Sequence, residues 1–347
     1  AVVISASHNP YRDNGIKLFG RDGNKLADDV ELAIERRLEA TGHPVPDRMG
    51  RIQTLHGTLE DYLRELQQRF GALDLDGVDV LLDCANGATF RAAPEIFRRL
   101  GAKVTTIADA PDGRNINEGV GSTHVEALGA AVVAGGHDLG FAFDGDGDRV
   151  LAVDRTGAVV DGDELIALTA LHLRDAGRLP GDGVVVTVMT NYGFHVAMRA
   201  AGIDVAVTGV GDRYVLEELR ARGWALGGEQ SGHVIEMGFN PTGDGIASAL
   251  LTLEALAGRD LADRGGMEKL PQRLVNVPVG DRDGVMASAD LAQAADREGE
   301  ALAGRGRVLV RPSGTEQLVR VMVEAPTADE ADAACERLVA IVRGASL

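Results

Sequence analysis

The sequence contains little cysteine and no long apolar run, and both shortages restrict what the protein can be. Its 347 residues include only two cysteines, Cys84 and Cys335. Two cysteines so far apart support neither a disulfide framework nor a thiolate zinc site, and this usage favours a reducing cytoplasm. No apolar run approaches the roughly 18 to 20 residues that a membrane span requires, and no charged-then-apolar leader opens the chain. We therefore expect a cytoplasmic protein without a membrane segment.

Positive charge is also scarce. Lys and Arg total 35 against 53 Asp and Glu, which gives a formal net charge of −18 at pH 7. No basic cluster with interleaved aromatic residues provides a track for a phosphate backbone, so we do not expect a nucleic-acid partner. An anionic substrate must instead be captured by a few locally placed Arg, Lys and backbone N–H groups. We expect a small-molecule site in a local basic pocket.

The order of apolar patterns predicts an α/β protein of several domains. From residue 75 onward, short β-branched runs such as VDVLLD and KVTTIAD alternate with helical patterns, and a second round of this alternation follows residue 155. After a Gly- and charge-rich stretch at 257–272, which is typical of a linker, the pattern changes to antiparallel α+β and ends in an amphipathic helix over 329–343. The expected domains are 1–58, 59–155, 156–268 and 269–347.

The chain opens directly on an apolar run, AVVI, that leads into a polar loop. Such a run normally has strand neighbours on both sides, so this one has the pattern of a strand cut in mid-element. We therefore expect residues 1–58 to be the remaining part of a first α/β domain. By the same reasoning, we expect the sequence to be a fragment of a longer protein.

The densest group of acids is FDGDGDR, residues 143–149, which lies between two apolar runs. In an extended loop, positions i, i+2 and i+4 face one side, so Asp144, Asp146 and Asp148 can converge while the glycines permit the turn. An Asp-Gly hairpin turn is the alternative. An EF-hand is rejected because arginines stand where its loop needs glycine and an acid. Three concentrated carboxylates favour a hard divalent cation, and magnesium is the natural ion.

A second pattern, RPSGTEQLVR at residues 311–320, places two hydroxyls, a glycine and two arginines where a strand ends in a loop. Arginine gives bidentate donors to a phosphate, and glycine lets backbone N–H groups approach the oxygens. A Pro-Gly hairpin turn with exposed arginines is the alternative. No Walker A pattern occurs, so nucleotide binding has no support. The candidate phosphate-binding residues are Arg311, Ser313, Gly314, Thr315 and Arg320.

A third pattern, GGEQSGH at residues 227–233, is a glycine-flanked loop with an acid, an amide, a hydroxyl and an imidazole. Glu229 can accept from two adjacent sugar hydroxyls, and Ser231 can donate or accept. The glycines let such a loop reach into a cleft. The alternative is a surface turn with a solvated glutamate.

The opening loop, SASHNPYRDNGIK at residues 5–17, places a hydroxyl, an imidazole and an ammonium close together in sequence, on Ser7, His8 and Lys17. This combination is typical of an activated nucleophile. No HExxH, GxSxG or CxxC pattern competes with it anywhere in the chain. Taken alone, the SHN triplet favours a turn that has an N-cap-like serine.

Taken in order, SASHNP, FDGDGDR, GEQSGH and RPSGTEQLVR resemble the α-D-phosphohexomutase superfamily over essentially the whole chain. The branch that acts on glucosamine phosphates is favoured by ISASHNP, VGDRYVLEEL and TGDGI, and by Gln230, where phosphomannomutase/phosphoglucomutase enzymes typically have Met. The resemblance implies a heart-shaped molecule with three related α/β domains and a fourth α+β domain that closes the cleft.

The resemblance also implies roles for the motif residues. Ser7 would be carried as phosphoserine, with magnesium held by its phosphate and the three aspartates of residues 144–148. Glu229 and Ser231 would hold sugar hydroxyls, and the 311–320 loop would clamp the phosphate that is not reacting. The residues that match positions near the transferring phosphate, where they would stabilise charge or handle protons, are His8, Lys17, Arg149 and His233.

The implied reaction interconverts glucosamine 6-phosphate and glucosamine 1-phosphate through a hexosamine 1,6-bisphosphate that serves as intermediate and activator. The product would lead to UDP-N-acetylglucosamine, and the resemblance is compatible with a homodimer. A phosphoglucomutase or phosphomannomutase is the alternative within the superfamily. From other classes, a magnesium-dependent phosphatase and a non-catalytic sugar-phosphate-binding fragment remain open.

Overall fold

The chain divides into two compact units in a computed structural model. Unit 1 contains residues 1–188 and 206–264, and unit 2 contains residues 189–205 and 265–347. The division at 264–265 falls inside the stretch that the sequence marks as a linker. Both units combine helices and sheets, which confirms the expected α/β architecture with an α+β C-terminal part. The structure describes residues 1–21, 23–39, 42, 48, 50–313 and 316–345.

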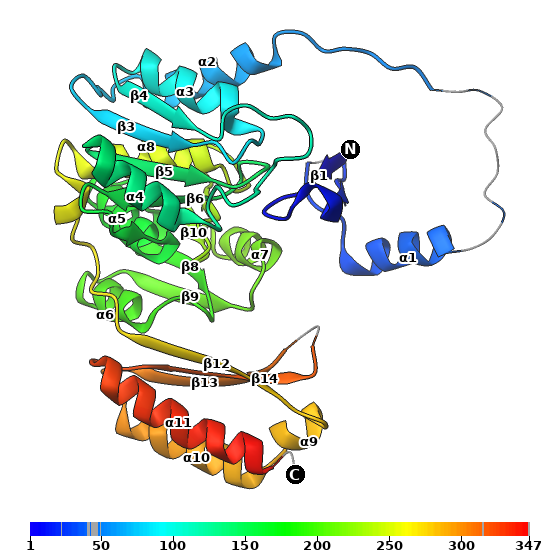
Figure 1. Ribbon diagram of the computed structural model, residues 1–347, viewed down its shortest axis with the longest axis vertical. Helices are drawn as coiled ribbons and strands as arrows, with labels where there is room; N and C mark the ends of the chain where they lie inside the picture. The colour runs from blue at the N-terminus through cyan, green and yellow to red at the C-terminus, as the bar shows by residue number, and fades with distance from the viewer. Residues whose placement is uncertain (22, 40–41, 43–47, 49, 314–315, 346–347) are drawn as a thin grey trace. The chain divides into compact units, whose positions relative to one another are not determined.

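Unit 1 begins with a hairpin that presents the opening loop. β1 (Val2–Ser5) pairs antiparallel with β2 (Gly15–Leu18), so that Ser5 lies opposite Gly15 and the loop between them starts and ends at the same place. A short 3₁₀ helix, η1 (Tyr11–Asp13), lies within the loop, and helix α1 (Asp28–Glu39) follows the hairpin (Figure 1). We call residues 6–14 the reactive loop.

The next part of unit 1 contains a five-stranded sheet. Its strands are β3 (Asp79–Asp83), β4 (Lys103–Ile107), β5 (Leu139–Phe143), β6 (Val150–Asp154) and β7 (Val159–Val160). Its helices are α2 (Thr58–Phe70), α3 (Thr89–Arg99) and α4 (Val125–Gly135). The order is β4-β3-β5-β6-β7, in which β3 pairs in parallel with β4 and β5. Every residue of β5 is buried, which explains its unbroken apolar sequence LGFAF. The turn from β5 to β6, residues 144–149, carries the three aspartates.

A second sheet follows with the order β11-β10-β8-β9. Its strands are β8 (Gly183–Thr187), β9 (Asp204–Thr208), β10 (Leu226–Gly228) and β11 (Val234–Glu236), and its neighbouring helices in unit 1 are α5 (Gly162–Asp175), α7 (Asp212–Arg222) and α8 (Gly245–Leu256). Two short 3₁₀ helices are η2 (Pro180–Asp182) and η3 (Leu261–Asp263). α8 is mostly apolar and is buried at every residue except Glu254, as expected of a helix inside a core. The turn between β10 and β11 is the GGEQSGH loop.

Unit 2 has a three-stranded antiparallel sheet in the order β12-β14-β13. Its elements are α6 (Tyr192–Ala200), β12 (Gln272–Pro278), α9 (Arg282–Met286), α10 (Ala289–Ala301), β13 (Arg307–Pro312), β14 (Leu318–Glu324) and α11 (Ala328–Gly344). The central strand β14 and the inner faces of α10 and α11 form one apolar core. α11 confirms the amphipathic helix predicted over 329–343. No helix among the described residues is long and apolar enough to span a membrane.

One buried charge pair joins the segments of unit 2. Glu324 at the end of β14 is fully buried and accepts hydrogen bonds from Nε of Arg307 at 2.7 Å and from the Tyr192 N–H at 2.8 Å. A buried carboxylate is tolerated when it is paired in this way. The pair therefore ties the start of α6 to the sheet.

Candidate active site

The reactive loop holds Ser7 in a left-handed backbone conformation, with φ of 49°. Non-glycine residues rarely adopt this conformation, so neighbouring groups must hold it. The Ser7 carbonyl oxygen accepts hydrogen bonds from the Asn117 side-chain amide at 2.8 Å and from the Gly145 N–H at 3.1 Å. The Ser7 hydroxyl oxygen lies 3.4 Å from Nδ1 of His8. The loop thus presents a hydroxyl beside an imidazole, on a backbone held by other parts of unit 1.

The turn from β5 to β6 brings three carboxylates together. One oxygen from each of Asp144, Asp146 and Asp148 lies within 4.8 Å of the other two. Oδ2 of Asp144 and Oδ1 of Asp146 and Asp148 are buried without a hydrogen-bond partner among the described residues. Unpaired buried carboxylate oxygens are costly, and a hard divalent cation relieves all three at once. These residues therefore fit a magnesium ion.

Burial and crowding set the charge of these acids. Burial, followed by repulsion from Asp148 and Asp146, raises the pKa of Asp144 to about 8. Burial also acts to raise the pKa of Asp146, but hydrogen bonds from Lys17 and Ser5 outweigh it and hold this pKa below its usual value. Acids this close repel one another unless positive charge is near, so the cluster favours cations.

Lys17 on β2 supplies positive charge to the aspartates. Its Nζ lies 2.5 Å from Oδ2 of Asp146 and 3.6 Å from Oδ2 of Asp148. Burial acts to lower the pKa of Lys17, but the hydrogen bond and charge of Asp146 outweigh burial and raise it. Oδ2 of Asp146 also accepts from the Ser5 hydroxyl at 2.6 Å, and this hydroxyl accepts from the Ser7 N–H at 2.9 Å. Lys17 and Ser5 therefore fix one oxygen of Asp146 and leave the other for a cation.

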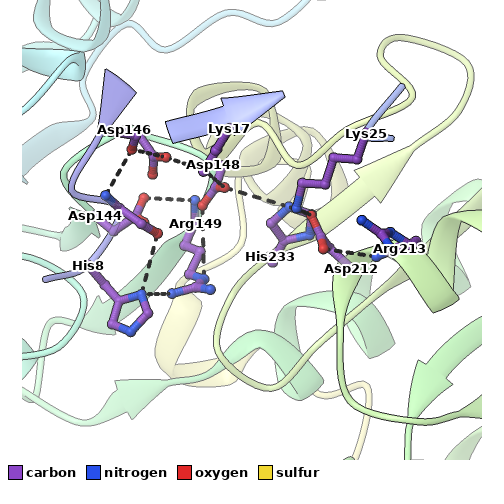
Figure 2. Close-up of polar contacts among 12 residues, drawn as sticks. His8, Lys17, Lys25, Asp144, Asp146, Asp148, Arg149, Asp212, Arg213 and His233 are labelled. Carbon is purple, nitrogen blue, oxygen red and sulfur yellow. Dashed lines mark hydrogen bonds and ion pairs between the residues drawn. The ribbon is translucent and has the colours of Figure 1, made fainter. Parts of the chain in front are cut away.

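Arg149 follows the aspartates directly and reaches the reactive loop. Its Nη1 lies 2.5 Å from Nδ1 of His8, and its backbone N–H donates to Oδ1 of Asp144 at 3.1 Å (Figure 2). Burial, followed by the positive charge of Arg149, lowers the pKa of His8. The imidazole is therefore neutral at pH 7 and can accept a proton. A cation and a neutral base beside the Ser7 hydroxyl suit a group that carries negative charge.

His233 lies between two carboxylates, as Figure 2 shows. Its Nε2 is 3.9 Å from Oδ2 of Asp148 and 3.8 Å from Oδ2 of Asp212. Burial lowers the pKa of His233, although these carboxylates act to raise it. Lys25 donates to Oδ2 of Asp212 at 2.5 Å, which extends the charged network to the N-terminus of α7. The ring nitrogens of His233 make no hydrogen bond to a described residue and remain available to a ligand.

A cavity of about 430 Å³ connects these groups. Glu229, which is 9% exposed, accepts a hydrogen bond from the Gly211 N–H at 3.0 Å and lies on its wall with Ser231. The predicted site residues of unit 1 that line the cavity are Ser7, His8, Lys17, Asp148, Arg149, Glu229, Ser231 and His233. Asp144 and Asp146 belong to the same turn as Asp148, and one carboxylate oxygen of each lies within 4.8 Å of the other two. Unit 1 therefore gathers its predicted residues around one opening.

The 311–320 loop belongs to unit 2. Arg311 and Arg320 face each other across β13 and β14, and burial, followed by the charge of Arg320, lowers the pKa of Arg311. Ser313 is buried, and its carbonyl oxygen accepts from Arg282 at 2.7 Å. Two arginines therefore lie next to the first residue of the loop, whose backbone is held by Arg282. The predicted residues Gly314 and Thr315 lie outside the described residues.

Four residues that contact the cavity of unit 1 or the 311–320 loop were not among the site residues predicted from sequence patterns. Asp212 stands in VGDRYVLEEL, whose acid at a helix start is the one available signal. Lys25, Asn117 and Arg282 lie in stretches without a recognisable pattern. Their partners are distant in sequence, so no local pattern marks these residues.

Domain descriptions of the phosphoglucomutase/phosphomannomutase family match four successive parts of the chain. Alpha/beta/alpha domain I matches residues 1–44, domain II residues 53–157, domain III residues 161–274 and the C-terminal domain residues 274–341. Together these matches cover most of the sequence.

Curated relatives and a solved structure agree with these matches. The phosphoglucosamine mutase of Moorella thermoacetica is 53% identical over 336 residues, which are 95% of this chain and 76% of that protein. The phosphoglucosamine mutase of Desulforudis audaxviator is 51% identical over 98% of this chain and 77% of its own length. The Aspergillus fumigatus N-acetylphosphoglucosamine mutase, solved with GlcNAc-6P and magnesium, has a similar fold, with a TM-score of 0.78, 20% identity, and coverage of 100% of this chain and 89% of that chain. The chain belongs to the phosphoglucomutase/phosphomannomutase family of isomerases, on its phosphoglucosamine mutase branch.

Proposed function

We propose that the chain interconverts glucosamine 6-phosphate and glucosamine 1-phosphate, with Ser7 carried as phosphoserine. The phosphoryl group of Ser7 passes to the free hydroxyl of the substrate and forms glucosamine 1,6-bisphosphate. This intermediate turns end for end and returns its other phosphoryl group to Ser7. The observation that carries the proposal is that Ser7, Asp148 of the aspartate cluster and the cationic side chains of Lys17 and Arg149 lie at one cavity in unit 1.

Phosphoryl transfer needs positioning and charge neutralisation more than a strong base. Lys17 and Arg149 are placed to neutralise the oxygens of a phosphate on Ser7. Nδ1 of His8 accepts from Arg149 beside the Ser7 hydroxyl, where the imidazole helps to place positive charge, and Nε2 of His233 can hold or release a proton. Magnesium, held by the aspartates of residues 144–148 and the Ser7 phosphate, would supply further neutralisation of the transferring group.

The two ends of the substrate have different partners in this proposal. Glu229 and Ser231 bind sugar hydroxyls at the cavity of unit 1. The non-reacting phosphate binds to unit 2, through Arg311, Ser313, Gly314, Thr315 and Arg320. The magnesium and GlcNAc-6P of the Aspergillus structure support a sugar phosphate and this metal as ligands of the fold. A clamp of arginines and hydroxyls suits a phosphate that must bind in either sugar orientation.

Other expectations from the sequence remain part of the proposal. The domain ranges are 1–58, 59–155, 156–268 and 269–347. Cys84 and Cys335 are both free and buried, which supports a reducing cytoplasm as the location. Glucosamine 1-phosphate would then serve the synthesis of UDP-N-acetylglucosamine. A homodimer is compatible with this function.

Phosphorus NMR tests the proposal most directly. The protein is incubated with magnesium and a trace of hexose 1,6-bisphosphate, in parallel with glucosamine 6-phosphate, glucose 6-phosphate and mannose 6-phosphate. We expect the new 1-phosphate signal to grow fastest from the glucosamine compound. A faster signal from glucose or mannose would transfer the proposal to the phosphoglucomutase/phosphomannomutase branch. Inorganic phosphate as the main product would indicate a phosphatase, and binding of the sugar phosphates without any new signal would indicate a non-catalytic binding fragment.

A further inference from the structure

The backbone of the reactive loop is held by one buried asparagine side chain. Nδ2 of Asn117 donates to the carbonyl oxygen of Ser7 at 2.8 Å and to that of Asn9 at 2.8 Å, so both amide hydrogens are used. The two acceptors lie on either side of His8. The Ser7 oxygen also accepts from the Gly145 N–H at 3.1 Å. Asn117 and the aspartate turn therefore meet at the carbonyl of Ser7.

The atoms around the hydrogen bond from Asn117 to Ser7 are tightly packed. A methyl group added at Gly145 would lie 2.5 Å from the Ser7 carbonyl oxygen and 2.6 Å from Nδ2 of Asn117. Asn117 is 6% exposed, and its own N–H donates to the carbonyl oxygen of Ala85 at 2.9 Å. Close packing of this kind transmits a displacement of one group to the next. A shift of Asn117 would therefore move the Ser7 backbone relative to the aspartate turn.

The loop that carries Asn117 is hydrogen-bonded to the end of β3. The fully buried carboxylate of Asp83 accepts from the Ala85 N–H at 2.9 Å and from the Gly121 N–H at 2.8 Å. Its two oxygens thus fasten the loop after β3 and the loop that carries Asn117. A buried carboxylate that accepts hydrogen bonds from two backbone N–H groups fixes the local geometry. The backbone around Asn117 is therefore anchored to the end of β3.

We propose that Asn117 is a positioning residue that keeps Ser7 in its left-handed conformation and in register with the aspartate turn. The inference rests on the proposed function, because it gives Ser7 the role of phosphoryl carrier. Left-handed backbone is unfavourable for a serine, so without the hydrogen bonds from Asn117 other conformations of Ser7 compete. Small displacements of a reacting group reduce turnover steeply even when substrate binding is retained.

The test compares Asn117→Asp with Asn86→Asp. The first change keeps the shape of the side chain but replaces two donors with a carboxylate facing two carbonyl oxygens. Asn86 provides a matched control: it is also an asparagine with positive φ in a neighbouring loop, but its side chain contacts Asn115 and Ala110 rather than the reactive loop. We expect kcat to fall roughly 10- to 100-fold in Asn117→Asp with KM nearly unchanged. Asn86→Asp should stay near the wild-type values.

Two further measurements separate positioning from general damage. Amide hydrogen exchange within residues 6–10 should speed up in Asn117→Asp, whereas exchange in β3 and β5 should match the control. Intact mass spectrometry after incubation with glucose 1,6-bisphosphate should show slower phosphorylation of Ser7 in this variant than in the wild type. If Asn117→Asp does not fold, Asn117→Ser removes these hydrogen bonds without adding charge and is measured in the same way.

The outcomes distinguish the inference from the function beneath it. A wild-type protein that never acquires phosphate on Ser7 would overturn both. A wild type that is phosphorylated, together with Asn117 variants that react and exchange as fast as Asn86→Asp, would overturn the positioning role alone. A variant with raised KM and unchanged kcat would likewise contradict it, because that pattern indicates lost substrate binding.

Discussion

The cavity of unit 1 and the 311–320 loop of unit 2 differ in how their positive charges are balanced. In unit 1, Lys17 pairs with Asp146 at 2.5 Å, and Arg149 lies 3.9 Å from Asp148. In unit 2, Arg311 has no ion pair with a described carboxylate, and the pairing of Arg320 is a long one, at 3.9 Å from Glu316. One region has an excess of acid, and the other has an excess of base.

This difference indicates which ligand each region lacks. Burial and the crowding of Asp146 and Asp148 raise the pKa of Asp144 to about 8 even though Lys17 and Arg149 lie beside the cluster, so unit 1 is complete only with a further cation that relieves this repulsion. Two adjacent arginines repel each other, and burial and this repulsion lower the pKa of Arg311, so unit 2 is complete only with an anion. In a protein with a net charge of −18, such local arrangements rather than the overall field must attract a sugar phosphate.

The largest effect is expected from Ser7→Ala, which removes the group proposed to carry phosphate. Turnover should be lost, because the hydroxyl beside His8 that would accept and donate the phosphoryl group is gone. Magnesium binding without substrate, measured by isothermal titration calorimetry, should persist because the aspartates remain. Undiminished turnover in Ser7→Ala would rule out Ser7 as the carrier.

Asp146→Asn should weaken the response to magnesium by roughly 10- to 100-fold and lower kcat. The change removes one negative charge from the cluster and leaves Lys17 without its closest partner. The measurement is the magnesium concentration that gives half-maximal rate. Asp175→Asn, at an exposed acid outside the cavity, is the matched control. If both variants needed the same magnesium concentration for half-maximal rate, Asp146 would not take part in binding the metal.

Arg311→Ala should act on binding rather than on the chemical step. Charge-assisted hydrogen bonds contribute about 1.5 to 3 kcal/mol, so KM for glucosamine 6-phosphate should rise roughly 10- to 100-fold while kcat changes less. Arg337→Ala removes a surface arginine that pairs with Glu298 and serves as the control. An unchanged KM in Arg311→Ala would show that the phosphate clamp lies elsewhere.

Features that depend on neighbouring residues can be predicted from the sequence. Contacts between residues that are far apart in the chain cannot. The aspartates of residues 144–148 are predictable because a single turn brings them together. The alternation of strands and helices likewise reveals the α/β character before the α+β end. Lys25 and Asn117, by contrast, bond to partners 187 and 110 residues away, and no periodicity marks such a contact.

The hydrogen bond from Asn117 to the Ser7 carbonyl oxygen illustrates why such contacts cannot be predicted. Asn117 has an ordinary loop sequence around it, and its role depends on the meeting of three chain segments at one oxygen. Arg282 is hidden for the same reason, because its contact with the Ser313 carbonyl depends on how α9 lies against the loop. Motifs identify the residues that carry chemistry, whereas the residues that hold them in place emerge from tertiary packing.

The smallest effect concerns His195 on α6 of unit 2, which is half-buried beside two arginines. Burial, followed by the charges of Arg307 and Arg199, lowers the pKa of His195 to about 4. A histidine in the unfolded chain titrates near 6.5, so this group's contribution to stability is complete above that pH and is lost as the pH falls toward 4. Between pH 7 and 5, the free energy of unfolding should fall by on the order of 1 kcal/mol more in the wild type than in His195→Gln. Urea unfolding at the two pH values measures this difference. Equal losses in both proteins would mean that burial and the neighbouring arginines do not lower the pKa of His195 in the folded protein.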